Sequence, residues 1–373
     1  MQVPTRPPST IVSLKDGQPW GIDLVDGKLD RKYNYTYSGN GVNVYVFDTG
    51  IMSNHDEFGS GRVTCGLNTI TDEVCDDLKG HGTHVAATVG GKTYGLARKV
   101  SLINVKVLDK NGTGSVSKVL EGLEYVVSQK LLFPATPMIV GLSLGSNYSA
   151  SFNDAITRCV DAGIVVVAAS GNEQVDACTV SPASAEKAVT VGAMDVTLLR
   201  PIWSNYGSCV NLFAPAVAIL SATYDAKDRK KTTYRSGTSM AVPHVVGVVA
   251  MYLEWNPKLR PNEINDYLIK DSTFGILLNL DFDLEDDDKD ANNLLISSAK
   301  VQTYQPTTLA PTRSPSRSIT FLPSESPSEE QVERGSCGVV FSICVTDEDC
   351  CFSCLSFDLF NLGLWGQRCF WFG

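Results

Sequence analysis

The chain has 373 residues and a formal net charge of −10 at pH 7, because 41 acidic side chains outnumber 31 Lys and Arg side chains. This length suits one large domain with a small addition, and an acidic balance without a basic cluster argues against a nucleic-acid partner. No apolar run reaches the length of a membrane span, and Met1 is not followed by the charged and apolar regions of a signal peptide. We therefore expect no membrane span, and no signal peptide within this sequence.

Along the chain, apolar runs alternate with helix-like stretches. Residues 1–17 contain three prolines and are predicted to form an extended arm before a domain at 18–302. Within that domain we predict strands over 42–47, 100–107, 138–144, 163–169, 188–193 and 217–221, and helices over 81–90, 115–129, 150–162, 238–255 and 261–270. Such alternation predicts an α/β sandwich, in which helices cover both faces of a mostly parallel sheet.

Polar side chains stand at the ends of four of these elements. Asp48 ends the strand in VNVYVFD, and Asn172 follows the strand in VVVAASGN. His81 opens a glycine-flanked helix in GHGTHVA, and Ser239 opens an apolar helix just after Gly237. Open α/β sheets bind ligands at such ends, and a serine at a helix N-terminus lies among N–H groups that can hold an oxyanion. Ser239 alone would be an ordinary small residue at a helix start, but the four groups together favour nucleophilic catalysis.

Seven motifs in a fixed order extend this pattern: VFDTGI, GHGTHVA, LSLG, AASGN, SPAS, SNYGS and SGTSMAVPH. They resemble the subtilisin-like serine proteases, and within them the proteinase K branch, over residues 18–300. The resemblance implies a three-layer αβα sandwich and a serine endopeptidase that works through an acyl-enzyme and needs no cofactor. It also implies that Ser239 is the nucleophile, His81 the general base and then acid, and Asp48 the carboxylate that fixes the imidazole tautomer. Asn172 would donate to the oxyanion beside the Ser239 N–H group.

The resemblance also implies a substrate cleft. An extended peptide would pair between the segment around Gly112, Thr113 and Gly114 and the segment Ser143, Leu144 and Gly145. Taken alone, the glycines at 112 and 114 would be ordinary turn residues. Ala169, Ser170 and Gly171 would line the pocket for the side chain before the cut. These small neutral residues predict an apolar pocket and broad specificity.

The other histidines have structural interpretations. His84 lies one helical turn after His81, and His244 lies inside the helix that begins near Ser239, so we predict packed, hydrogen-bonded residues at both positions. His55, in the polar segment SNHDE, is predicted to lie at the surface.

A calcium ion is the one metal that the resemblance suggests, as a structural ion. The matching positions are the carbonyls of Glu186 and Ala188 and the side chain of Asn211, where the proteinase K branch has an aspartate. The loss of a negative charge should weaken a hard-cation site, although an amide oxygen can still coordinate. The acidic run at 281–290 is predicted to be a solvated loop.

The cysteines point outside the cytosol. The resemblance suggests a Cys178–Cys209 disulfide, and we expect Cys65 to pair with Cys75 across the loop before His81, which leaves Cys159 as a buried thiol. Glycosylation sequons begin at Asn34, Asn111 and Asn147 and are meaningful on a secretory route. We expect a secreted enzyme, or one in a secretory or vacuolar compartment, whose family is usually made as a zymogen with a propeptide.

Beyond residue 302 the composition changes. Residues 303–333 are rich in Pro, Ser and Thr and predict an extended linker, and residues 334–373 hold six cysteines, which predicts a knottin-like disulfide module. The module also holds the aromatic residues Phe357, Phe360, Trp365, Phe370, Trp371 and Phe372. They predict a face that binds a polysaccharide, a surface or a protein; the alternative is that some pack against the large domain or are poorly ordered. We expect a monomer.

Two alternatives to a broad protease remain open. One is a selective processing protease, and the other is a catalytically silent binding protein on the same scaffold. The presence of all four polar groups, at Asp48, His81, Asn172 and Ser239, argues against the silent protein.

Overall fold

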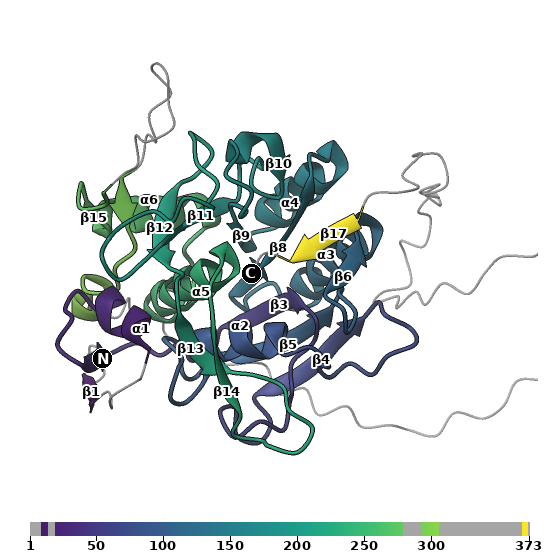
Figure 1. Cartoon of the computed structure of the whole chain (residues 1–373), viewed down its shortest axis with the longest axis horizontal. Coiled ribbons are helices and arrows are strands. Elements are labelled where there is room, and N and C mark those ends of the chain that lie inside the picture. The colour runs from purple at the N-terminus through teal and green to yellow at the C-terminus, as the bar shows by residue number, and fades with distance from the viewer. Residues whose placement is uncertain (1–8, 14–18, 279–292, 306–367, 372–373) are drawn as a thin grey trace, which may run out of the picture. The chain divides into compact units, whose positions relative to one another are not determined.

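A computed structural model describes residues 9–13, 19–278, 293–305 and 368–371. Nine strands of this part form the main sheet (Figure 1). In spatial order they are β15 (Thr273–Phe274), β16 (Leu294–Leu295), β12 (Leu212–Pro215), β11 (Val189–Met194), β9 (Val165–Ala169), β7 (Met138–Leu142), β3 (Asn43–Asp48), β5 (Ser101–Lys106) and β4 (Val63–Asn68). All neighbouring pairs are parallel except β15 with β16.

The other strands within the described residues form three small sheets. A pair joins β1 (Thr10–Ser13) to β2 (Lys32–Tyr35), and another joins β13 (Ile219–Ala222) to β14 (Thr232–Arg235). The third runs in the order β10 (Val180–Ser181), β8 (Leu144–Asn147), β17 (Arg368–Trp371) and β6 (Thr113–Ser115).

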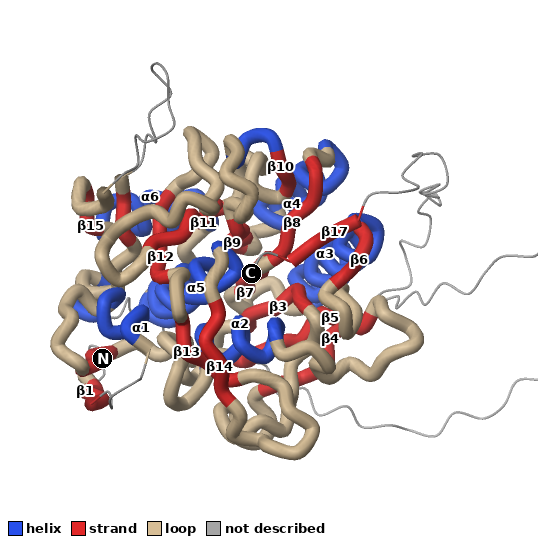
Figure 2. The backbone as a smooth tube through the Cα atoms, in the orientation of Figure 1, coloured by secondary structure: helices blue, strands red, loops and turns tan. Residues whose placement is uncertain are grey.

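Helices cover both faces of the main sheet (Figure 2). They are α1 (Trp20–Val25), α2 (His81–Gly90), α3 (Val116–Leu132), α4 (Ala150–Asp161), α5 (Thr238–Trp255) and α6 (Pro261–Asp271), with short 3₁₀ turns at Ala177–Thr179 and Val301–Thr303. The predicted α/β sandwich is confirmed.

Strand β3 contributes side chains to the hydrophobic cores on both faces of the main sheet. Val44 and Val46 pack with α2 and α5 on one face, whereas Tyr45 and Phe47 pack with α3 and α4 on the other. Successive side chains of a strand point to opposite faces, so a strand covered on both sides has a continuous apolar run. This layering holds β3 rigidly and fixes the position of its last residue, Asp48.

Two strand predictions differ from the structure. The sequence predicts a sheet strand over 217–221, but Ile219–Ala222 forms a separate hairpin with β14, and Leu212–Pro215 is the sheet strand instead. The edge strand β4 was missed because its sequence, VTCGLN, lacks a clean alternation and its side chains are only partly buried. Helix α1 was missed because six residues are too few to show a helical period.

The structure contains both disulfides, Cys65–Cys75 and Cys178–Cys209. Cys159 is a buried free thiol on α4, and burial raises its pKa to about 12, so it stays protonated and unreactive at neutral pH.

The linker and most of the cysteine-rich module lie outside the described residues. Residues 365–373 group with residues 1–308 in one compact unit, whereas the sequence assigns them to the module. Among the described helices, none has the length and apolar character needed to cross a bilayer.

Candidate active site

Asp48 and His81 form a buried pair. Both carboxylate oxygens of Asp48 lie 2.8 Å from His81 Nδ1, and neither side chain is exposed to solvent. The Thr49 N–H group donates to Asp48 Oδ1 at 2.7 Å and helps to hold the carboxylate. Because a carboxylate only accepts, Nδ1 must carry the proton and Nε2 becomes the basic nitrogen of the neutral ring.

Two glycines allow this approach. Gly80, the residue before α2, has φ +94°, and a Cβ there would lie 2.2 Å from Thr223 Oγ1. A Cβ on Gly82 would lie 2.1 Å from the Gly50 carbonyl oxygen. A larger residue at 82 would push the start of α2 away from the end of β3, and one at 80 would clash with Thr223, which follows β13.

The carboxylate of Asp77 anchors the segments that carry Asp48 and His81. Its Oδ1 accepts from Thr49 Oγ1, Lys79 N and Gly80 N, each at 2.8 Å. Its Oδ2 accepts from the Thr83 N–H group at 2.9 Å and from Thr83 Oγ1 at 2.6 Å. Buried Asp77 therefore connects the residue after β3 to the first turn of α2. A carboxylate at that turn also interacts favourably with the helix dipole.

Ser239 lies at the same edge of the sheet. Its hydroxyl donates to the Ser143 carbonyl at 3.2 Å, and the Ser143 hydroxyl donates to the Ser239 carbonyl at 2.9 Å. Ser143 follows β7, whose Leu142 pairs with Phe47 in β3, so Ser143 and Asp48 leave adjacent strands side by side. Helices α2 and α5, which begin near these strand ends, pack against each other in the same core.

Asn172 reaches the start of α5 from the next strand, β9. Its Oδ1 accepts from the Thr238 N–H group at 2.9 Å and from Thr238 Oγ1 at 3.0 Å. These bonds fix which end of the amide is the acceptor and leave its NH₂ group as the donor. The structure thus brings Asp48, His81, Asn172 and Ser239 to one edge of the sheet.

The segments predicted to border a cleft are short strands close to this edge. Thr113 and Gly114 belong to β6, Leu144 and Gly145 belong to β8, and Gly112 and Ser143 immediately precede them. A Cβ on Gly114 would lie 2.4 Å from the Val107 carbonyl oxygen, which explains the need for glycine there.

The predicted pocket wall is buried. Ala169 and Ser170 are at most 1% exposed, and the Asn205 side chain donates to the Ser170 carbonyl at 2.9 Å. A Cβ on Gly171, which has φ +108°, would lie 2.2 Å from Asn205 Nδ2. The turn after β9 is therefore held in one conformation.

The sequence matches the subtilase family over residues 39–301. The chain belongs to the subtilase family. An extracellular serine proteinase of a Thermus species is 44% identical over 264 residues, which are 70% of this chain and 63% of that protein. A cuticle-degrading serine protease of Arthrobotrys oligospora is 43% identical over 63% of this chain and 58% of its own length. This subtilase thus spans less than two thirds of these curated relatives. It also superposes on the crystal structure of a cold-adapted subtilisin-like serine proteinase with a TM-score of 0.68 and 38% identity, covering 76% of this chain and 99% of the other.

The remaining histidines of the subtilase are buried. His84 Nε2 lies 3.0 Å from the Ile219 carbonyl oxygen, and His244 Nδ1 donates to the Met240 carbonyl at 2.8 Å. Burial lowers the pKa of His84 to about 3 and that of His244 to about 4, so both are neutral at pH 7. The structural interpretation of both is confirmed. The surface prediction for His55 is wrong: it is 2% exposed, contacts Phe58 and lies 3.0 Å from the Lys231 carbonyl oxygen, because the loop around Lys231 packs over it.

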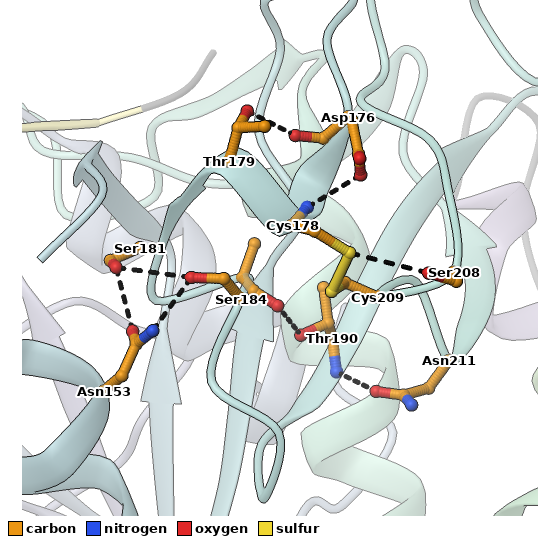
Figure 3. Close-up of a disulfide and its surroundings, with 11 residues drawn as sticks. Asn153, Asp176, Cys178, Thr179, Ser181, Ser184, Thr190, Ser208, Cys209 and Asn211 are labelled. Carbon is orange, nitrogen blue, oxygen red and sulfur yellow. Dashed lines mark hydrogen bonds between the residues drawn. A yellow bond between two sulfur atoms is a disulfide. The ribbon is translucent and has the colours of Figure 1, made fainter. Parts of the chain in front are cut away.

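The residues suggested for calcium do not form a favourable donor set. The Asn211 side-chain oxygen accepts from the Thr190 N–H group at 2.6 Å. This bond is drawn as a dashed line in Figure 3. The remaining suggested donors are the carbonyls of Glu186 and Ala188, so no carboxylate among the three supplies the charge that favours calcium. The described residues contain no cluster of three acidic, His or Cys side chains suited to a metal. Glu186, Ala188 and Asn211 therefore fit a calcium ion poorly. Calcium binding by this subtilase stays a prediction.

Sequence reasoning missed three residues that support the Asp48 region. They are Asp77, the buried Lys106, which pairs with Glu73 at 3.1 Å, and Arg235. Lys106 also donates to the Thr49 carbonyl. Burial lowers the pKa of Arg235, while the charges of Asp48 and Asp77 oppose that shift. Asp77 could have been suspected, because an acidic residue four positions before His81 precedes a helix start.

Proposed function

We propose that this subtilase is a serine endopeptidase with Ser239, His81 and Asp48 as its catalytic triad. As Ser239 Oγ bonds to the scissile carbonyl carbon, its proton passes to His81 Nε2 and the carbonyl electron pair moves onto oxygen. The Asn172 NH₂ group and the Ser239 N–H group stabilise that oxyanion. The oxyanion then collapses, the C–N bond breaks, and His81 returns the proton to the leaving amine. Water hydrolyses the acyl-enzyme by the same steps.

The observation that carries this proposal is the buried Asp48–His81 pair at the edge of the sheet that also holds Ser239 and Asn172. A carboxylate on Nδ1 favours the tautomer that a general base needs and stabilises the imidazolium that forms. Each step uses side chains or N–H groups of this chain.

Specificity is proposed to be broad, with an apolar pocket formed by the turn after β9. Ala169, Ser170 and Gly171 present no charged side chain to pair with a basic substrate residue. Membership of the proteinase K branch is supported by the fungal cuticle-degrading relative and by the Cys178–Cys209 disulfide. Secretion is supported by the two disulfides and by the extracellular relative.

A peptide-library digest with purified protein tests the proposal. We expect cleavage after many apolar residues, and a loss of about 10⁴-fold or more in the Ser239→Ala and His81→Ala variants. The Ser208→Ala variant, which changes a serine beside Cys209, should retain wild-type rates. Cleavage confined to one short sequence would favour a selective processing protease, and no cleavage under any condition would favour a silent binding protein.

A further inference from the structure

Strand β17 lies between the two segments proposed to bind substrate. Figure 1 shows this strand, in yellow, beside β8 and β6. It is antiparallel to both: Cys369 pairs with Gly114 in β6, while Phe370 pairs with Thr113 in β6 and with Gly145 in β8. A four-residue segment from the far end of the sequence thus completes a sheet that the large domain alone would leave open.

We propose that Arg368–Trp371 is a peptide ligand of its own chain, which occupies the substrate groove and inhibits the enzyme in cis. The proposal rests on the proposed function, since it assigns an occupant to the same groove. Its basis is the backbone register, which has the geometry of strand addition.

The two strands that border the groove offer backbone hydrogen-bonding groups to such an occupant. Without β17, the backbone groups of β6 and β8 that face it would lose this partner, although Thr113 keeps two bonds to Asp109: its N–H group donates to Asp109 Oδ1 and its carbonyl accepts from the Asp109 N–H group. A peptide substrate would satisfy these groups by the same backbone pairing. An intramolecular strand and a substrate therefore compete for one set of hydrogen-bonding groups.

The register also brings the segment close to the nucleophile. Trp371 pairs with Leu144, and Leu144 follows Ser143, the residue that exchanges two hydrogen bonds with Ser239. A substrate strand aligned for attack by Ser239 must run along these same residues. While β17 is paired there, the substrate has no free edge to join.

Tethering makes a weak contact effective. A ligand held on the same chain has an effective concentration on the order of 1 mM. If the segment binds with a dissociation constant of about 0.1 mM, within the usual range of substrate KM values, the apparent KM rises about tenfold. Because the inhibition is competitive, kcat should be unaffected.

The test uses the full chain with Phe370→Pro, because Phe370 pairs with both edges and proline removes its N–H donor. We expect kcat/KM for a peptide substrate to rise about tenfold through KM. The matched control is Phe321→Pro, the same substitution within the predicted linker, which should behave as wild type. A synthetic peptide of residues 365–373, with serine for Cys369, should competitively inhibit the Phe370→Pro enzyme.

A second measurement does not depend on proline. A recognition site for a sequence-specific protease, inserted within residues 303–333, allows the tail to be severed after folding. Activity should then rise on dilution, as the effective concentration is lost.

Labelling of Ser239 by a fluorophosphonate distinguishes a failure of inhibition in cis from a failure of the protease assignment. Equal labelling rates and equal KM values in wild type, Phe370→Pro and severed protein would overturn inhibition in cis while leaving the protease assignment intact. Failure of all three proteins to label would overturn the protease assignment, and this inference with it.

Discussion

The substitution Asp77→Asn should weaken both stability and catalysis, although Asp77 contacts no substrate. The carboxylate accepts five hydrogen bonds at 2.6–2.9 Å, from Thr49, Lys79, Gly80 and Thr83. In asparagine one of the two acceptor oxygens becomes an NH₂ donor. At least the Thr83 N–H group, or a pair of N–H groups at 79 and 80, would then face another donor inside the protein.

The expected loss of folding free energy follows from the hydrogen bonds that are lost. Hydrogen bonds to a charged group contribute about 1.5–3 kcal/mol each, so losing one or two costs about 1.5–6 kcal/mol. That is a large fraction of a typical folding free energy of about 5–15 kcal/mol. Movement of the first turn of α2 would also displace His81, and a displacement near 1 Å can lower the rate about 100-fold.

Two assays check this prediction. Urea unfolding, carried out in a Ser239→Ala background to prevent autolysis, should show the loss of stability. Steady-state kinetics of Asp77→Asn with Ser239 intact should show a fall in kcat of about 10–100-fold with little change in KM. The control is Asp76→Asn. Asp76 immediately precedes Asp77 and is only partly buried, so its substitution should change stability by about 0.5 kcal/mol or less. An unchanged free energy of unfolding in Asp77→Asn, together with a kcat within twofold of wild type, would refute the anchoring role.

Four further outcomes are expected. Asn172→Ala should lower kcat by about 10²–10³-fold with KM little changed, because the amide acts on the oxyanion and not on the bound substrate. Cys178→Ser should lower the free energy of unfolding by about 3–4 kcal/mol, since the lost disulfide closes a loop with a sequence separation of 31 residues. Stability should fall between pH 7 and pH 5 by about 2 kcal/mol for each of His84 and His244. Their folded pKa values, about 3 and 4, lie below the unfolded value, so protons bind the unfolded chain preferentially as the pH drops below about 6.5. Asn211→Asp should give a larger loss of Tm on chelation of calcium than wild type shows, because a carboxylate restores negative charge beside two carbonyls.

Each of these expectations has a contradicting result. A raised KM with unchanged kcat would show that Asn172 binds substrate in the ground state. Unaltered urea unfolding of Cys178→Ser, or wild-type stability that is equal at pH 5 and pH 7, would contradict the loop-closure and titration arguments. Equal chelator effects on wild type and Asn211→Asp would remove calcium from this position.

The sequence predicted those parts of the molecule that have strong local patterns. Helices at His81–Gly90 and Thr238–Trp255 have the predicted bounds, because glycines and an apolar run mark their ends. The sheet strands around Asp48 were also predicted, because apolar residues, many of them β-branched, fill both faces of each strand.

Other features depend on contacts between distant segments, which no local pattern encodes. The burial of His55 arises from the loop around Lys231, far along the chain. The five-bond arrangement around Asp77 forms only when the end of β3 meets the start of α2. The pairing of Arg368–Trp371 with β6 and β8 joins segments more than 200 residues apart, and the sequence alone suggested that these residues belong to a separate module.

Mass spectrometry after treatment with a fluorophosphonate tests the central claim most directly. The reagent reacts with a serine only when a neighbouring base activates its hydroxyl. We predict one adduct per chain, mapped to Ser239, whose formation is lost in the His81→Ala variant and slowed in Asp48→Asn. No adduct on Ser239 in the wild-type protein, even with the Phe370→Pro substitution, or an equal rate without His81, would contradict the account.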